Sequence, residues 1–251
     1  MNLKILGNYK TDEFQIVMEG LPKTVVFDAE EPDFVLIFQS FSGERRESEV
    51  LEIKRRFPIT PILAVLGSWC EGETRTGTPL LGVHNMLWYD FAAMAPLEFE
   101  AWKRGLPTVW SLPEGALPDA MEMLTRTRNR TIFENFERKP AKIWIESDDF
   151  EQFRLQRDIF HTLFDCETFG RFAGCEDAAL TESDILVFDF PDFTPATQAR
   201  FSELKTRFPK ARCVTFLEFP RWNEQRQIQS YGADAVFPKP FRIQDLKFFL
   251  K

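Results

Sequence analysis

Residues 183–218 read "SDILVFDFPDFTPATQARFSELKTRFPKARCVTFLE", and an earlier stretch of the chain repeats their pattern. That stretch, residues 32–67, reads "PDFVLIFQSFSGERRESEVLEIKRRFPITPILAVLG". Several residues recur at an offset of 151 (184 − 33 and 207 − 56), and these are Asp33 with Asp184 and Arg56-Phe57-Pro58 with Arg207-Phe208-Pro209. A near-constant offset over about 60 residues indicates a duplicated domain.

Each copy alternates short apolar runs with amphipathic stretches. "FVLIF" and "ILVFD" are typical of strands buried in a parallel sheet, and "EVLEIKRRF" and "ARFSELKTRF" are helical stretches that end before a proline. The likeness continues where "GVHNMLWYDF" from Gly82 matches "GADAVFPKPF" from Gly232, with an offset of 150. Strands that alternate with helices at this spacing predict parallel βαβ units and an α/β fold.

The beginnings of the two copies differ in length. In the second copy, "AKIWIES" predicts a first strand, and residues 148–164 predict a first helix that Asp148 or Asp149 caps. The first copy is shorter here by about one helix, and residues 14–29 fit either a helix and a strand or a β-hairpin.

These patterns predict three segments along the chain. A divergent first domain occupies residues 1–110, and a second domain occupies residues 140–251. Between them, residues 111–139 form a linker that contains a helix from about Asp119 to Glu137.

Composition narrows the functional classes. The 251 residues are 44% hydrophobic and 28% charged, which is enough to bury a core. The net charge of −8 disfavours a general nucleic-acid footprint, so a DNA partner is not expected. The start lacks signal-peptide features and no run is long enough for a membrane span, so the cytoplasm is the expected compartment. No C-x-x-C pair occurs among Cys70, Cys166, Cys175 and Cys213, which argues against a zinc ribbon or a thioredoxin-type site.

Three features of the second copy match one family. "ESDD" follows its first strand, Asp189 ends its third strand, and "GADAVFPKPF" carries Lys239 before a proline and a phenylalanine. On these residues the second copy resembles the CheY-like receiver domains of response regulators. The resemblance implies two tandem flavodoxin-like, three-layer αβα domains with parallel sheets in strand order 2-1-3-4-5.

The resemblance also implies a chemistry for the second copy. Asp189 would accept a phosphoryl group, and Lys239 would pair with its oxygens. Asp148, with Ser147 or Asp149, would hold Mg²⁺ together with Asp189, and Ser147 in a metal position would remove one carboxylate. Two positions depart from the family, since Leu217 falls where a Ser or Thr is usual and Val236 falls where an aromatic residue is usual. Asp189 and Lys239 are therefore either competent for phosphorylation or a remnant ion pair.

The first copy departs further. Phe38 falls at the Asp189 position (189 − 151 = 38) with Gln39 beside it, and Tyr89 falls at the Lys239 position with Asp90 after it (239 − 150 = 89). Without an acceptor carboxylate or a clamping ammonium, aspartyl phosphate chemistry is not expected in this copy.

The leading functional interpretation is therefore a signal-transduction adaptor. Tandem receiver-like domains, at least one of them a pseudo-receiver, would act through protein contacts within two-component or phosphorelay signalling. A histidine kinase or another signalling protein is the expected partner, and receiver-like domains also imply a homodimer. Phosphorylation at Asp189 would modulate the contacts if that residue is competent.

A second interpretation is an α/β enzyme or a small-ligand-binding protein. The stretch "LGSWCEGETRTG", residues 66–77, follows the fourth strand of the first copy, and its glycines predict an irregular loop where the second copy predicts a helix. The candidate residues there are Trp69, Cys70, Glu71, Glu73 and Arg75, with His84 further along. The more conservative expectation is that Cys70 is a buried thiol and that Trp69 is anchored in the domain.

A third interpretation is a transcription regulator that acts through the basic residues Arg126, Arg128 and Arg130. We expect these arginines to form a solvated helix face instead.

Overall fold

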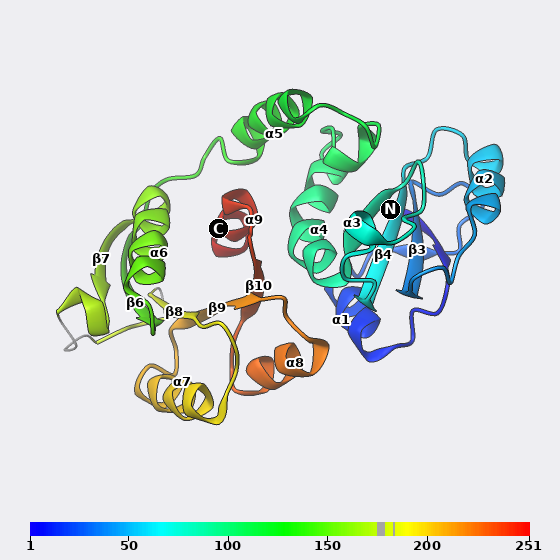
Figure 1. Cartoon of the computed structure of the whole chain (residues 1–251). Helices are drawn as coiled ribbons and strands as arrows, with labels where there is room; N and C mark the ends of the chain where they lie inside the picture. The colour runs from blue at the N-terminus through cyan, green and yellow to red at the C-terminus, as the bar shows by residue number, and fades with distance from the viewer. Residues whose placement is uncertain (175–178, 183) are drawn as a thin grey trace. The chain divides into compact units, whose positions relative to one another are not determined.

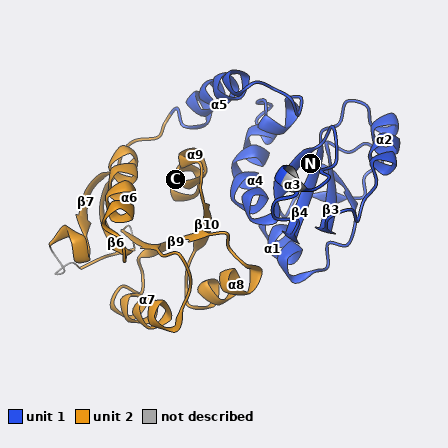
Figure 2. Cartoon of the chain, in the orientation of Figure 1, with its two compact units in different colours: residues 1–134 blue, residues 135–251 orange. Residues whose placement is uncertain are grey.

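A computed structural model describes residues 1–174, 179–182 and 184–251 (Figure 1). Cys175 and Ser183, which entered the sequence predictions, lie outside the described residues. The chain divides into two compact units, unit 1 from Met1 to Glu134 and unit 2 from Asn135 to Lys251 (Figure 2). The helix predicted between the domains belongs to unit 1 and runs from Pro118 to Ile132.

Unit 1 is built around a parallel sheet with the strand order β2-β1-β3-β4-β5. Its elements are β1 (Asn2–Leu6), α1 (Asp12–Gly20), β2 (Val26–Phe27), β3 (Phe34–Phe41), α2 (Glu47–Arg56), β4 (Ile62–Trp69), α3 (Glu73–Thr76), β5 (His84–Leu87), α4 (Trp88–Lys103), η1 (Val109–Ser111) and α5 (Pro118–Ile132). Residues 14–29 therefore form a helix and a strand rather than a β-hairpin.

Unit 2 repeats this topology, and its parallel sheet has the order β10-β9-β8-β6-β7. Its elements are β6 (Pro140–Ser147), α6 (Phe150–Leu163), β7 (Asp165–Phe169), η2 (Arg171–Ala173), β8 (Ile185–Asp189), α7 (Pro195–Arg207), β9 (Arg212–Glu218), α8 (Trp222–Ser230), β10 (Ala235–Lys239) and α9 (Ile243–Leu250). Numbered within each unit, both sheets have the order 2-1-3-4-5, which confirms the prediction of two tandem flavodoxin-like domains.

Strand β3, in the middle of the unit 1 sheet, buries side chains on both faces. Phe34, Leu36 and Phe38 of β3 pack with residues of α1 and α4. The alternate residues Val35 and Ile37 pack on the opposite face, in a cluster that includes α2. Because helices cover both faces, the first six residues of β3 are all buried and almost continuously apolar, as the sequence indicated.

The residues that the two copies share lie at the amino ends of the strands. Asp33 accepts a hydrogen bond from the backbone N–H of Asn2 at 2.6 Å, and Asp184 accepts one from the N–H of Lys142 at 2.7 Å. Gly82 and Gly232, with φ of +71° and +102°, leave room for the side chains of Lys54 and Lys205 respectively. The repeated residues therefore stabilise the fold and do not mark a shared functional site.

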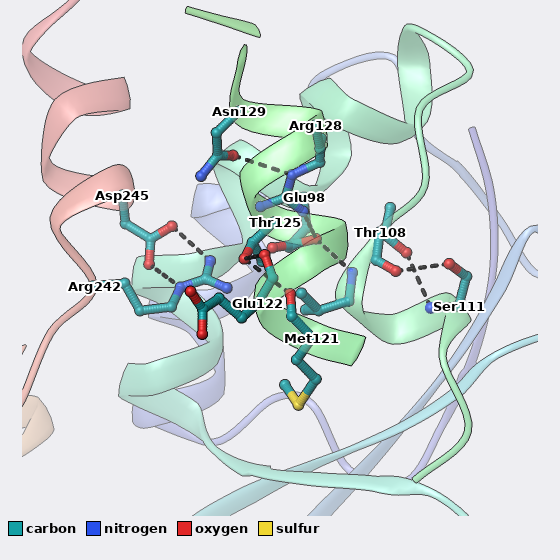
Figure 3. Close-up of polar contacts among 11 residues, drawn as sticks. Glu98, Thr108, Ser111, Met121, Glu122, Thr125, Arg128, Asn129, Arg242 and Asp245 are labelled. Atoms are coloured by element: carbon teal, nitrogen blue, oxygen red, sulfur yellow. Dashed lines mark hydrogen bonds and ion pairs between the residues drawn. The ribbon is translucent and has the colours of Figure 1, made fainter. Parts of the chain in front are cut away.

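Helix α5 is attached to unit 1 by a buried ion pair (Figure 3). Arg128 of α5 donates from Nη1 to Oε2 of Glu98 on α4 at 2.5 Å, and both side chains are 0% exposed. The same Glu98 oxygen accepts a hydrogen bond from the backbone N–H of Val109 at 3.0 Å. The predicted solvated face is thus wrong for Arg128, whereas Arg126 and Arg130 are exposed. None of the described helices is both long and apolar enough to cross a membrane.

Candidate functional site at the carboxyl ends of the strands

The carboxyl ends of β8 and β10 bring together two of the predicted residues of unit 2. Asp189 is the last residue of β8, and Lys239 is the last residue of β10. Lys239 Nζ lies 2.8 Å from Asp189 Oδ1 and 3.5 Å from an oxygen of Glu218. The Asp189 side chain is 0% exposed and that of Lys239 is 14% exposed, so this ion pair is largely sheltered from water.

A third residue of this site, Gln156 of α6, was missed at the sequence level. Gln156 is fully buried, and its Nε2 donates to Asp189 Oδ2 at 2.5 Å. Both carboxylate oxygens of Asp189 therefore have a donor from the chain itself. The available signal was one polar residue on the apolar face of α6 that also carries Phe153, Phe160 and Leu163.

The predicted Mg²⁺ ligands are engaged in local structure. Ser147, which pairs with Asp189 across β6 and β8, donates its hydroxyl to the carbonyl oxygen of Asp149 at 3.1 Å. The Asp149 carboxylate accepts the backbone N–H of Gln152 at 2.8 Å and so caps α6, while Asp148 is exposed. Among the described residues, no group of three or more His, Cys, Asp or Glu side chains could hold a metal ion. This donor set does not fit Mg²⁺, which requires several oxygen ligands around one point.

Strand register identifies the equivalent positions in unit 1. Phe38 pairs with Val65 as Asp189 pairs with Phe216, so Phe38 is the counterpart of Asp189, as predicted. The prediction that Tyr89 replaces Lys239 is wrong by one residue. Leu66 pairs with Leu87, whereas its counterpart Leu217 pairs with Pro238, and the residue after Leu87 is Trp88. The turn from Gly82 to β5 is one residue shorter than the turn from Gly232 to β10, which shifted the alignment.

A carboxylate from α1 lies at this edge of unit 1. Glu13, 7% exposed, accepts at Oε2 from the backbone N–H of Ser68 at 2.9 Å and from the Ser68 hydroxyl at 2.7 Å. Trp88 donates its indole N–H to the same hydroxyl oxygen at 3.1 Å. Gly67 makes this possible, because a Cβ at that position would overlap Glu13 Oε1.

The loop after β4 has a buried and an exposed side. Trp69 is 85% exposed, so the expectation that it is anchored in the domain is wrong. Cys70 is buried, as expected, and Glu73 is buried and accepts the backbone N–H of Thr78 at 3.2 Å. Glu71 and Arg75 are exposed. The helix between β4 and β5 is reduced to the four residues of α3, whereas the equivalent helix of unit 2, α8, has nine residues.

The structure separates the candidate nucleophile from the candidate base. Cys70 follows the carboxyl end of β4, whereas His84 is the first residue of β5 and so lies at the amino ends of the strands. His84 contacts the carbonyl oxygen of Leu112 through Nε2 at 2.9 Å. Burial raises the pKa of Cys70 to about 11. A thiol with this pKa is protonated at neutral pH, whereas catalytic cysteines act as thiolates.

Asp90, in the first turn of α4, provides a testable pH dependence. Burial raises its pKa to about 6, above the ordinary value of about 3.9 for an unfolded chain. The folded state therefore favours the protonated form, and this contribution to stability is present below about pH 4 and lost as pH rises through about 6. We expect Asp90→Asn to raise the melting temperature at pH 8 and to have little effect at pH 4, measured by thermal denaturation. The exposed Glu30→Gln serves as control, and an equal gain at both pH values would contradict the prediction.

Comparisons with known proteins concern the fold. No family model and no curated protein matches the chain. A response regulator receiver domain from Clostridium thermocellum has 15% identity and a TM-score of 0.34, covering 44% of this chain and 90% of that one. A putative two-component system response regulator/GGDEF domain protein has 10% identity and a TM-score of 0.33, covering 98% and 94%. The C-terminal domain of glucosamine-fructose-6-phosphate aminotransferase from Francisella tularensis has 13% identity and a TM-score of 0.29, covering 99% and 81%. At these scores the matches assign no activity to this chain.

Proposed function

We propose that the chain is a cytoplasmic signalling adaptor, a pseudo-response regulator that acts through protein contacts rather than through aspartyl phosphorylation. The observation that carries the proposal is the state of Asp189, whose two oxygens are held by Lys239 and Gln156 in a buried site. A carboxylate can attack a phosphoryl donor only if one of its oxygens is open to that donor.

The surroundings of Asp189 support the same proposal. Ser147 stands beside it on the neighbouring strand, and the Asp149 carboxylate caps α6. Magnesium would neutralise charge during phosphoryl transfer, and the residues that the structure describes offer it no converging carboxylates. The partner in this proposal is a histidine kinase, another signalling protein or a second copy of the chain.

An enzyme with Cys70 as nucleophile is less well supported. The thiol is buried with a pKa of about 11, and His84, the first residue of β5, lies at the amino ends of the strands, away from Cys70. Neither observation favours covalent catalysis at neutral pH.

Incubation of the purified full chain with acetyl phosphate and Mg²⁺, followed by intact-mass spectrometry, tests the proposal. We expect no phosphoryl adduct, and we expect no change in melting temperature with beryllofluoride and Mg²⁺. Asp189→Asn and the exposed Asp192→Asn are the matched variants. An adduct that disappears in Asp189→Asn but persists in Asp192→Asn would show that unit 2 is a working receiver and overturn the proposal.

A further inference from the structure

The two units differ in how the acidic groups at the carboxyl ends of their strands are neutralised. In unit 2 the chain supplies its own cation, because Lys239 Nζ lies within 4 Å of Asp189 and Glu218. In unit 1, register places Trp88 at the position of Lys239 and Phe38 at that of Asp189. Neither of these two unit 1 positions therefore holds a charged side chain, although Glu13 lies nearby through its hydrogen bond with Ser68, which also binds the Trp88 indole.

The first of these acidic groups is Glu13. It is more than nine-tenths buried, and both of its hydrogen bonds are made through Oε2, to the N–H and the hydroxyl of Ser68. Within the described residues, Oε1 accepts no hydrogen bond and Glu13 forms no ion pair. A sheltered carboxylate with one open oxygen is a strong acceptor for a charged donor.

The other acidic groups lie close enough to Cys70 and Tyr89 to raise the pKa values of these two residues. The pKa of Cys70 is raised mainly by burial, and Glu73 and Glu13 raise it further. The pKa of Tyr89 is also raised mainly by burial, with Asp90 and Glu71 contributing. Every charged group that shifts these two pKa values is a carboxylate. Glu13, Glu71, Glu73 and Asp90 form no ion pair within the described residues, and we call these four carboxylates the acidic edge.

A buried amide beside the acidic edge also has an unsatisfied acceptor. Gln39 is 1% exposed, and its Nε2 lies 3.9 Å from Cys70 Sγ, so its amide group is directed at the loop that carries Glu71 and Glu73. Its Oε1 has no hydrogen-bond partner in the part of the chain that the structure describes. A buried acceptor without a donor is uncommon in folded proteins, and this one lies next to the loop of the acidic edge.

Two exposed aromatic side chains flank the same strand ends. Phe41 at the end of β3 pairs in register with Trp69 at the end of β4, and they are 55% and 85% exposed. Exposed aromatic faces bind guanidinium groups and the aliphatic stem of arginine. A planar group with five N–H donors also suits several separate oxygen acceptors better than a compact ammonium does.

We propose that the acidic edge of unit 1 binds an arginine side chain presented by a peptide segment of a partner protein, with Glu13 as its principal acceptor and Phe41 and Trp69 against its stem. This inference names a surface and a partner chemistry that the proposed adaptor function leaves open. It does not depend on whether Asp189 is phosphorylated.

Titration of the isotopically labelled full chain with N-acetyl-arginine amide, followed by amide and indole NMR signals, tests the proposal. We expect saturable shifts at Ser68, Trp69 and the Trp88 indole N–H, and none with N-acetyl-citrulline amide, which keeps the shape but lacks the charge. Glu13→Gln is expected to weaken binding by roughly tenfold, because a charge-assisted hydrogen bond becomes a neutral one. The exposed Glu30→Gln is expected to bind like the unmodified chain.

Three results would overturn the proposal. Equal shifts with the citrulline probe, or unchanged affinity in Glu13→Gln, would mean that the charge of Glu13 is not recognised. Binding that appears only in Arg75→Gln would mean that Arg75 of the same loop fills the position in solution. None of these results bears on the acetyl phosphate experiment, so the two proposals fail separately.

Discussion

Replacing Arg128 by alanine is expected to lower the free energy of unfolding of unit 1 by about 3–5 kcal/mol. The guanidinium is the cation paired with Glu98, and neither side chain of the pair is exposed. Removing one partner of a buried pair leaves the other as an uncompensated buried charge. The resulting loss of stability is larger than the contribution of a typical surface ion pair. The loss is measured by urea denaturation followed by tryptophan fluorescence.

Matched variants separate this effect from a general sensitivity of α5. Arg126→Ala and Arg130→Ala remove exposed arginines from the same helix and are expected to change stability by less than about 0.5 kcal/mol. Glu98→Gln combined with Arg128→Met removes both charges and is expected to recover part of the loss. If Arg128→Ala behaves like its exposed neighbours, the buried pair does not hold α5 on unit 1.

The fold could be predicted because the repeated residues have a structural task in both units. Asp33 and Asp184 tie the first strand of each sheet, and Lys54 and Lys205 each pack over a glycine with a positive φ. Such tasks depend on local geometry that both copies keep. A constant offset between them therefore predicted the alternating elements and the strand order.

The candidate site was less predictable because it depends on contacts between distant elements. Gln156 reaches Asp189 from a helix 33 positions earlier, and no local pattern assigns a polar residue to one partner. Trp88 was missed because one turn is a residue shorter in unit 1, and a slip of one residue in a strand changes which side chain faces the site. Burial of single residues was equally hard to predict, since Trp69 is exposed and Arg128 is buried.

A second large loss of stability is expected at the Asp189–Lys239 ion pair of unit 2. Replacing Lys239 by methionine removes the ammonium that lies 2.8 Å from the fully buried Asp189 carboxylate. Gln156 remains as a neutral donor to the other oxygen, which does not compensate a buried charge. We expect the free energy of unfolding of unit 2 to fall by about 3 kcal/mol in urea denaturation at pH 7.

A double-mutant cycle distinguishes the ion pair from the loss of the lysine stem. Asp189→Asn combined with Lys239→Met leaves no charge in the site and is expected to be more stable than Lys239→Met alone, because the uncompensated carboxylate is gone. Glu218→Gln is expected to have an effect under about 1 kcal/mol, since that side chain is 52% exposed. Lys210→Met, at an exposed position of the same unit, controls for the change in net charge. If Lys239→Met and the double variant lose equal stability, Asp189 and Lys239 are not energetically coupled and the site is not held closed by its ion pair.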